Sequence, residues 1–564
     1  MSIGNILNTA LAGLHVASAG IDITSRNIGN ADQPGYTRKT QDQTTDITGA
    51  PMVESVRRTV DAGLRKTSRD TASSVGMLDV QNRYATQISL TFGAPADANS
   101  LSSLTSALGD TFLSLATRPE ADIAYTEVVY AAQQVAGGVR GLYQQADRVA
   151  TNAGNELDEA IARANQDIGQ IDGLNKEIIA NIGGDTTDLE DQRDQAIFSL
   201  AAKLDITTFD RADGGVSVYT KSGTMLVDVA ASKLSSRTVG VGQTGLQVQL
   251  SSGAGTPTQV QPRSGSIAGL LDVMNQQVPA LQGQLDTFAT GLADATANAA
   301  ATIDFDHQPT DGQTLTVMVY DGTYDPTTRI PNGSSVTFEF QTTPTAPEVA
   351  IGLDQAASLQ NLVTAMQGHV PPISVSSNSN LLVLSSQYGI STTGGSAVAP
   401  IAPVPLFDAP STATPVRGAG FGRTIGVNPL VSTTPSLIRS GSSLTSFAPG
   451  DARYIDAVGG VFQSNTVSFG GSAMAATNSL AGAASDIITG QSTTQANLAG
   501  QLAVETTTQT SIEGLISSES GVNLDTEFSH LLQLQQAYAA NARIVSTTQS
   551  LFNTLLIASG GPGI

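Results

Sequence analysis

The residues that could carry out chemistry in this chain are few and scattered. Its 564 residues include no Cys and only four His, at positions 15, 307, 369 and 530. Without Cys there are no disulfides, thiolate metal sites or thiol nucleophiles. The four His stand too far apart in the sequence for a short zinc-binding motif, and none is placed as a general base for a Ser. The sequence therefore predicts a protein that is not an enzyme, with no catalytic residue, no metal site and no cofactor.

Two patterns resemble binding motifs but lack the necessary context. The segment Gly240–Gly245 has the spacing GxGxxG, yet the strand-like residues LQVQL follow it, and Gly265 stands where a ribose-binding acid would be sought. We interpret this segment as a turn between two strands. Asp304, Asp306 and Asp311 lack the residue order and terminal Glu of a calcium loop, which favours an incidental acidic loop.

Charge is scarce and mostly acidic. Charged residues make up 13% of the chain, and 27 basic against 49 acidic residues give a net charge of −22, which excludes a phosphate backbone as an obvious partner. Two clusters of opposite sign stand out: Arg57, Arg58, Arg65, Lys66 and Arg69, and then Asp185, Asp188, Glu190, Asp191 and Asp194. Each is either a solvated helix face or one half of a complementary contact between subunits.

Both ends of the chain carry an apolar seam with alternating spacings of four and three, the period of 3.5 residues that is typical of paired helices. The N-terminal seam is Ile3, Leu7, Ala10, Leu14, Ala17, Ile21, Thr24 and Ile28. The C-terminal seam is Leu524, Phe528, Leu531, Gln535, Tyr538, Ala542, Val545, Gln549, Phe552 and Leu556. Because neither seam has another apolar element beside it in the sequence, we expect the two helices to bury each other.

The sequence between the ends predicts an α+β multidomain protein: terminal coiled-coil-like helices, a long-helix bundle domain and inserted β-rich domains. Helical spacing continues at 157–182 and 267–300, whereas 214–229, 245–250, 315–320 and 335–340 are typical of strands. We predict that residues 1–50 with 515–564 form a terminal helical domain that serves assembly and is disordered in the monomer. Residues 51–301 with 449–514 would form the bundle, with a small β-module at about 205–262. Residues 302–448 would form the inserted β-rich domain. The uncharged stretch 355–407 within it is either β-structure with a polar surface, which we favour, or a loosely ordered segment.

No segment has the pattern of a secretory signal or of a membrane span. The first basic residue is Arg26, and Asn5, Asn8 and His15 interrupt the apolar residues before it. We therefore expect no cleavable signal peptide and no membrane partner, which is compatible with export by a machine that reads an uncleaved N-terminus.

The two ends also resemble a known superfamily. Residues 25–38, SRNIGNADQPGYTR, resemble the N-terminal signature of bacterial flagellar rod, hook and hook-associated proteins, with Gln33 where Thr is usual. Residues 523–555 look like the matching C-terminal motif. Inside the chain, 188–194 (DLEDQRD) and 265–272 (GSIAGLLD) are similar to the family of first hook–filament junction proteins. The residues that carry this family motif are Asn27, Asn30, Pro34, Gly35, Tyr36, Arg38, Asp191, Gln192, Arg193 and Asp194.

The resemblance implies a structural subunit of the flagellum, outside the cell at the junction between hook and filament. Members of the family leave through the flagellar type III export channel and form a ring by packing their terminal helices. The implied partners are further copies of the chain, the hook protein, the second junction protein, and an export chaperone on the C-terminal helix at Leu531, Leu534, Tyr538 and Leu551. Three alternatives stay open: another axial protein, such as a hook protein or flagellin; a secreted adhesin that acts through the β-insert; or a hydrolase with a cryptic site, for which the sequence offers no nucleophile–base pair.

Overall fold

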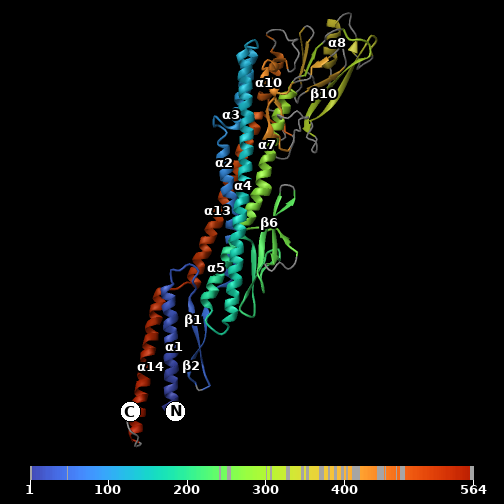
Figure 1. Ribbon diagram of the computed structural model, residues 1–564. Coiled ribbons are helices and arrows are strands. Elements are labelled where there is room, and N and C mark those ends of the chain that lie inside the picture. The colour runs from blue at the N-terminus through green and yellow to red at the C-terminus, as the bar shows by residue number, and fades with distance from the viewer. Residues whose placement is uncertain are drawn as a thin grey trace. The chain divides into compact units, whose positions relative to one another are not determined.

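A computed structural model (Figure 1) describes residues 3–558, except 48, 241–242, 251–255, 300, 305–307, 325–330, 345–348, 351–354, 368–373, 379–380, 386–389, 395–398, 402–403, 409–418, 441–449, 451, 465–466 and 470–476. The chain divides into two compact units. The first unit comprises 1–82, 153–275 and 498–564, and the second comprises 83–152 and 276–497. The predicted division into three domains stays a prediction.

The first unit contains both ends of the chain. Helix α1 (Ile3–Gly29) lies alongside helix α14 (Leu524–Ala558), as the two seams predict (Figure 1). The hairpin of β1 (Lys39–Thr45) and β2 (Pro51–Arg58) follows α1 and packs against it. Asn523 begins α14 because its side-chain oxygen accepts the backbone N–H of Thr526, at 3.1 Å.

Long helices make up most of the remainder, and three of them contribute residues to both units: α2 (Ala62–Phe92), α4 (Asp122–Ala180) and α13 (Leu480–Ser520). Helix α4 contains the predicted helix at 157–182 except its last two residues, and it begins 35 residues earlier. Gly183, shortly after its end, has the positive φ that a helix-ending Gly adopts. Helix α5 (Thr187–Lys203) belongs to the first unit. The predicted helix at 267–300 consists of α6 (Ser266–Asp272), the π-helical turn η1 (Val273–Gln277) and α7 (Val278–Ala297).

A small β-module lies between α5 and α6, within the predicted span. One three-stranded antiparallel sheet contains β3 (Ile206–Asp210), β4 (Val216–Thr220) and β5 (Met225–Val227). Another contains β6 (Ser232–Gly240), β7 (Gln243–Leu250) and β8 (Thr258–Val260). Because β6 ends at Gly240 and β7 begins at Gln243, the GxGxxG segment joins two antiparallel strands, and its residues 241–242 lie outside the described part.

The second unit contains the larger β-region. One four-stranded sheet has the order β12 (Val349–Ala350), β11 (Pro331–Gln341), β10 (Gln313–Tyr324) and β15 (Ile390–Gly394), in which β11 and β12 are parallel. The other has the order β13 (Ser374–Asn378), β14 (Leu381–Ser385), β9 (Ala301–Asp304) and β16 (Ala399–Ile401). Helix α8 (Gln355–Gln367) packs with the first sheet around buried Leu315, Phe340 and Leu362. The uncharged stretch from 355 therefore begins with a helix, which the β interpretation missed.

Short elements complete the second unit. They are α3 (Leu101–Thr117), β17 (Phe407–Asp408), α9 (Phe421–Thr424), β18 (Gly426–Val427), α10 (Pro429–Thr433), α11 (Leu437–Ser440), α12 (Arg453–Gln463), β19 (Val467–Ser468) and β20 (Thr477–Asn478). On α7, Asp286 accepts the backbone N–H groups of Gly420 and Gly422, each at 2.7 Å, and so holds the first turn of α9.

Among the described helices, α1 alone is long and apolar enough to span a membrane, over Gly4–Gly29, by length and composition only. The sequence pattern did not predict this candidate. The apolar stretch also pairs with α14, and two polar residues, Thr24 and Asn27, are its most deeply buried side chains. A buried polar face suits a helix that packs in protein better than one that faces lipid.

Candidate functional site

The two terminal helices pack in an antiparallel register that small residues of α1 make possible. A Cβ added at Gly13 would lie 2.7 Å from the Asn541 side chain, and one added at Gly20 would lie 3.0 Å from Leu534. One heptad further along, Asn27 Nδ2 donates to Glu527 Oε2 at 3.1 Å. The three pairs advance by seven residues on each helix in opposite directions, so one register holds along the pair.

The face of α1 that meets α14 is rotated from the predicted seam. Ala10, Ala17 and Thr24 of that seam are buried, but Gly13, Gly20 and Asn27 complete the contact face. The larger seam residues Leu7, Leu14, Ile21 and Ile28 are half-buried, and the side chain of Ile3 lies outside the described part. Small residues face α14 because helices approach closely only where side chains are short.

Helix α14 leaves much apolar surface uncovered in the single chain. Of the predicted C-terminal positions, Leu531, Leu534, Val545 and Leu556 are half-buried, whereas Leu524, Phe528, Tyr538, Leu551 and Phe552 are exposed. The register places Ile3 level with Leu551, so residues 552–558 extend beyond the start of α1. We call these residues the overhang; Phe552, Leu555 and Ile557 within it are 56%, 54% and 63% exposed.

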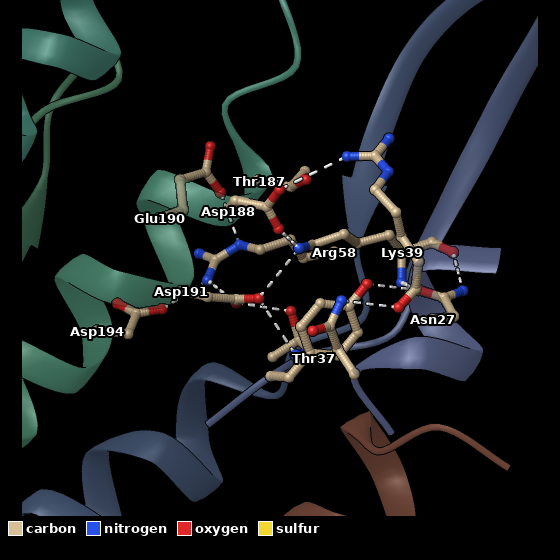
Figure 2. Close-up of polar contacts among 12 residues, drawn as sticks. Asn27, Thr37, Lys39, Arg58, Thr187, Asp188, Glu190, Asp191 and Asp194 are labelled. Carbon is tan, nitrogen blue, oxygen red and sulfur yellow. Dashed lines mark hydrogen bonds and ion pairs between the residues drawn. The ribbon is translucent and has the colours of Figure 1, made fainter. Parts of the chain in front are cut away.

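The family-motif residue Asp191 is the centre of a buried ionic network (Figure 2). Its Oδ1 accepts hydrogen bonds from the Thr37 hydroxyl, at 2.7 Å, and from Arg58 Nη1, at 2.8 Å. Its Oδ2 accepts the backbone N–H of Thr37 at 3.2 Å and lies 3.5 Å from Lys39 Nζ. Asp191 therefore ties α5 to the loop and hairpin that follow α1.

The acidic and basic clusters of the sequence meet each other in this network. Arg58 also donates to Asp194 at 2.8 Å and forms an ion pair with Glu190, whose Oε2 lies 2.7 Å from Arg58 Nε. Arg65 pairs with Asp194, and Lys39 donates to Asp188. Arg58 and Arg65 are therefore neither a solvated face nor free for a neighbouring subunit, which corrects both sequence interpretations for these two residues. Arg57, Lys66 and Arg69 bind within the chain too, to Asp42, Asp70 and Thr208.

The other motif residues support the same junction of segments. Asn27 Oδ1 accepts the Tyr36 hydroxyl and the backbone N–H of Lys39, at 3.0 and 3.1 Å. Asn30 donates to the backbone of Arg26 at 2.9 Å. Gln195 donates to the carbonyl of Pro34 at 2.7 Å, and Gly35, with φ of 78°, leaves room for the Gln195 side chain.

Within the DLEDQRD segment, Arg193 is buried and donates to Asn175 Oδ1 and to the carbonyl of Gly214, at 3.1 and 2.8 Å. It thereby joins α5 to α4 and to the turn before β4. Gln192 is exposed.

Burial perturbs several groups of the network. It raises the pKa of Tyr36 to about 12, against the opposing effect of Arg26. It lowers the pKa of Lys39, a shift that nearby Asp191 opposes. It also lowers the pKa of Arg65 to about 10, with Arg58 as a further cause. Burial also tends to raise the pKa of Asp185. Hydrogen bonds from Thr187 and Arg26 outweigh burial, so the pKa of Asp185 is lowered.

Sequence reasoning missed Thr37, Lys39 and Glu527 as members of this site. Glu527 is 1% exposed although it lies in an otherwise open helix, and Lys39 is 2% exposed. The signal that could have found Glu527 is an acid one turn inside an apolar-rich helix, where a buried carboxylate needs designated donors.

The arrangement has the features of a structural joint rather than of a reaction centre. In the part of the chain that the structure describes, no group of three or more His, Cys, Asp or Glu could hold a metal ion. Of the acidic triplet at 304–311, Asp306 lies outside the described part, and Asp311 accepts the backbone N–H of Thr342 at 2.7 Å.

Comparison with known proteins agrees with this description. The family "Flagellar hook-associated protein FlgK helical domain" matches residues 85–315, and "Flagellar basal body rod FlgEFG protein C-terminal" matches residues 516–557. Flagellar hook-associated protein 1 of Salmonella typhimurium is 25% identical over 98% of this chain and 99% of its own length. The Escherichia coli protein of the same name is 24% identical over the same shares of the two chains, and the Bacillus subtilis one is 24% identical over 40% and 47%.

A solved structure has the same fold. The flagellar hook junction protein FlgK from Burkholderia pseudomallei matches with a TM-score of 0.50 and 15% identity, over 80% of this chain and 100% of that chain. The chain is therefore similar to flagellar hook-associated protein 1 along nearly its whole length, and residues 85–315 match the helical-domain model of that family.

Proposed function

We propose that this chain joins its neighbours in the junction through the apolar surface that α14 leaves open, after export through the flagellar type III channel. The observation that carries the proposal is the overhang. In the register of the pair, Phe552, Leu555 and Ile557 lie beyond Ile3, the first described residue of α1, and all three are more than half exposed. Large apolar side chains gathered at one end of a helix are typical of a surface that a partner covers.

The proposed partners are further copies of this chain in a ring, the hook protein, the second junction protein and an export chaperone. The chaperone would bind α14 at Leu531, Leu534, Tyr538 and Leu551 before assembly. Leu534 lies against Gly20 of α1 in the folded chain, so α1 and the chaperone would compete for this side chain. The proposal includes neither a nucleic acid nor a membrane as a partner.

The test places a charge in the overhang. Phe552→Asp and Leu555→Asp should each abolish motility in a strain that lacks the native gene, because a carboxylate would have to be buried at the subunit contact. Since both residues are exposed in the single chain, the helical content and the midpoint of urea unfolding should not change. The matched control is Ser550→Asp, an exposed polar position one turn away, which should preserve motility.

Immunogold labelling of isolated hook–basal bodies locates the product. The native chain and the Ser550→Asp variant should label the distal end of the hook, and the two overhang variants should not. Normal filaments built by both overhang variants would contradict the proposal. The amount of each variant secreted into the medium must also be measured. A variant that is not exported would be defective at the chaperone step, and its loss of motility would say nothing about the subunit contact.

A further inference from the structure

The most deeply buried side chain of α14 is a carboxylate. The structure describes every residue from 524 to 558, and of these only Glu527 and Thr548 are buried. Burying a carboxylate is unfavourable unless charged or polar donors bind it. Glu527 therefore needs an explanation that general apolar packing does not provide.

Both carboxylate oxygens of Glu527 have a designated donor from the N-terminal motif. Oε1 accepts from Arg38 Nε at 2.7 Å, and Oε2 accepts from Asn27 Nδ2 at 3.1 Å. Asn27 itself is 1% exposed. Charge-assisted hydrogen bonds to a buried carboxylate are directional, so a change in the arrangement of these segments would break them.

Arg38 contacts both sides of the break between α13 and α14. Its backbone N–H donates to the carbonyl of Ser520, the last residue of α13, at 2.9 Å. Its side chain binds Glu527, beyond the three-residue connection 521–523. One residue thus holds the end of one helix and the first turn of the next.

The contacts continue from this point to α5. The residues next to Arg38, namely Thr37 and Lys39, bind Asp191. A chain of hydrogen bonds and ion pairs therefore runs from α14 through residues 37–39 to α5, as Figure 2 shows for its α5 side.

Apolar packing alone does not single out one face of α14. Its exposed apolar residues include Leu524, Phe528 and Leu532 on one stripe, but also Leu551, which falls on another side of the helix. A buried polar contact is the usual device by which paired helices select one alignment among several of similar apolar area.

We propose that Glu527 is a positioning residue: with Asn27 and Arg38 it fixes how α14 departs from α13 and how the terminal helix pair is held relative to α5. This inference concerns contacts within one chain and does not depend on the proposed subunit contact. The role of Glu527 could be disproved while the overhang is still found necessary for motility. Equally, the overhang could prove unnecessary while Glu527 is still found to position α14.

Spin labels can measure this directly because the chain contains no Cys. Labels at exposed Gln533 on α14 and Glu177 on α4, both in the first unit, report the position of the terminal pair. Labels at exposed Ser18 and Gln533 report the spacing of α1 and α14. Double electron–electron resonance on the purified full chain gives the distribution of each distance.

We expect a narrow distribution for both label pairs in the otherwise native chain. Glu527→Ala should broaden the 177–533 distribution at least about twofold, and Arg38→Ala should do the same. The double variant should be no broader than either single variant, because both remove one shared contact. Glu527→Gln should give a distribution of intermediate width, between those of the native chain and Glu527→Ala, because the amide oxygen of Gln still accepts a hydrogen bond from Asn27. Asp525→Ala, at an exposed acid in the same helical turn, should leave both distributions unchanged.

The inference fails if Glu527→Ala leaves the 177–533 distribution as narrow as in the native chain, or if Asp525→Ala broadens it equally. A broad 177–533 distribution in the native chain would overturn it as well. Unfolding of the variants is detected separately by circular dichroism, and Glu527→Gln preserves the shape of the side chain if Glu527→Ala does not fold.

Discussion

At the scale of single residues, the scarce positive charge of this acidic chain is used inside the chain. Arg58, Arg65 and Lys39 neutralise Glu190, Asp191 and Asp194 in a place from which water is largely excluded. Such a network contributes little to stability compared with apolar residues of the same volume, but removing one member is costly. The network therefore defines which segments must lie together.

This reasoning predicts the effect of Asp191→Ala. The substitution removes the carboxylate shared by Lys39 and Arg58 and leaves buried Thr37 without its acceptor, while Asp188, Glu190 and Asp194 still pair with the two cations. The free energy of unfolding should therefore fall by about 1–3 kcal/mol. Urea unfolding of the full chain, followed by circular dichroism, measures this. Asp172→Ala is the control, because Asp172 pairs at 2.7 Å with Lys176, which is 66% exposed. Asp172→Ala should lower the free energy of unfolding by less than about 1 kcal/mol. Equal decreases in the two variants would argue against a special role of Asp191.

At the scale of elements, glycine sets how closely helices and turns approach. Gly265, from the motif GSIAGLLD, has φ of 92° and precedes α6. A Cβ there would lie 2.4 Å from the backbone carbon of Lys203, at the end of α5. Gly269 is packed in the same way against the backbone of Met77 in α2. The motif thus marks a close crossing of backbones.

Gly265→Ala should therefore lower the free energy of unfolding by about 2–5 kcal/mol, through the left-handed backbone and the clash together. Gly283→Ala provides the contrast, since a Cβ at Gly283, inside α7, meets nothing within 4 Å. That variant should be unchanged or more stable by about 0.5–1 kcal/mol. Thermal and urea unfolding distinguish the two cases, and a neutral Gly265→Ala would show that the loop can relax.

Helical periodicity in the sequence was sufficient to predict both terminal helices and their pairing. It could not predict which face of α1 meets α14, because the contact uses Gly13 and Gly20, which a search for apolar residues passes over. It also missed α8, since a short helix without charged residues in a β-rich region has no distinctive composition. The acidic and basic clusters were recognised separately, but their pairing depends on segments more than 100 residues apart.

At the scale of the whole molecule, stability should depend on alkaline pH through buried phenols. Burial raises the pKa of Tyr454, on α12, to about 12 from an ordinary 10.0. Between these values the unfolded chain releases the proton and the folded chain keeps it. Folded stability from this group is thus complete below about pH 10 and is lost as the pH rises through about 12.

Comparison with Tyr454→Phe isolates this effect. The stability difference between the native chain and the variant should shift by about 2 kcal/mol between pH 10 and 12, in favour of the variant. Urea unfolding at a series of pH values, with the absorbance of tyrosinate as a second signal, measures it. The same two proteins at pH 7 serve as the control. If the stabilities of the two proteins changed in parallel with pH, the Tyr454 phenol would ionise as readily in the folded chain as in the unfolded chain.

The expectation that the chain ends are disordered in the isolated subunit stays a prediction, and the structure divides it into two parts. Asn27, Arg38 and Glu527 hold the end of the helix pair at which α14 begins, whereas the overhang lies beyond Ile3, the first described residue of α1. Hydrogen exchange on the purified chain should protect the amides around 524–530 more than those of 552–558.

The antiparallel register has a practical consequence for imaging live cells. Because the start of α1 lies level with Leu551, a fluorescent protein fused to either terminus would sit beside the overhang. With the subunit contact proposed above, such a fusion would block growth of the very structure that it was meant to show. A compact dye attached at an exposed position of α4, such as Glu177, would instead leave both ends of the chain free.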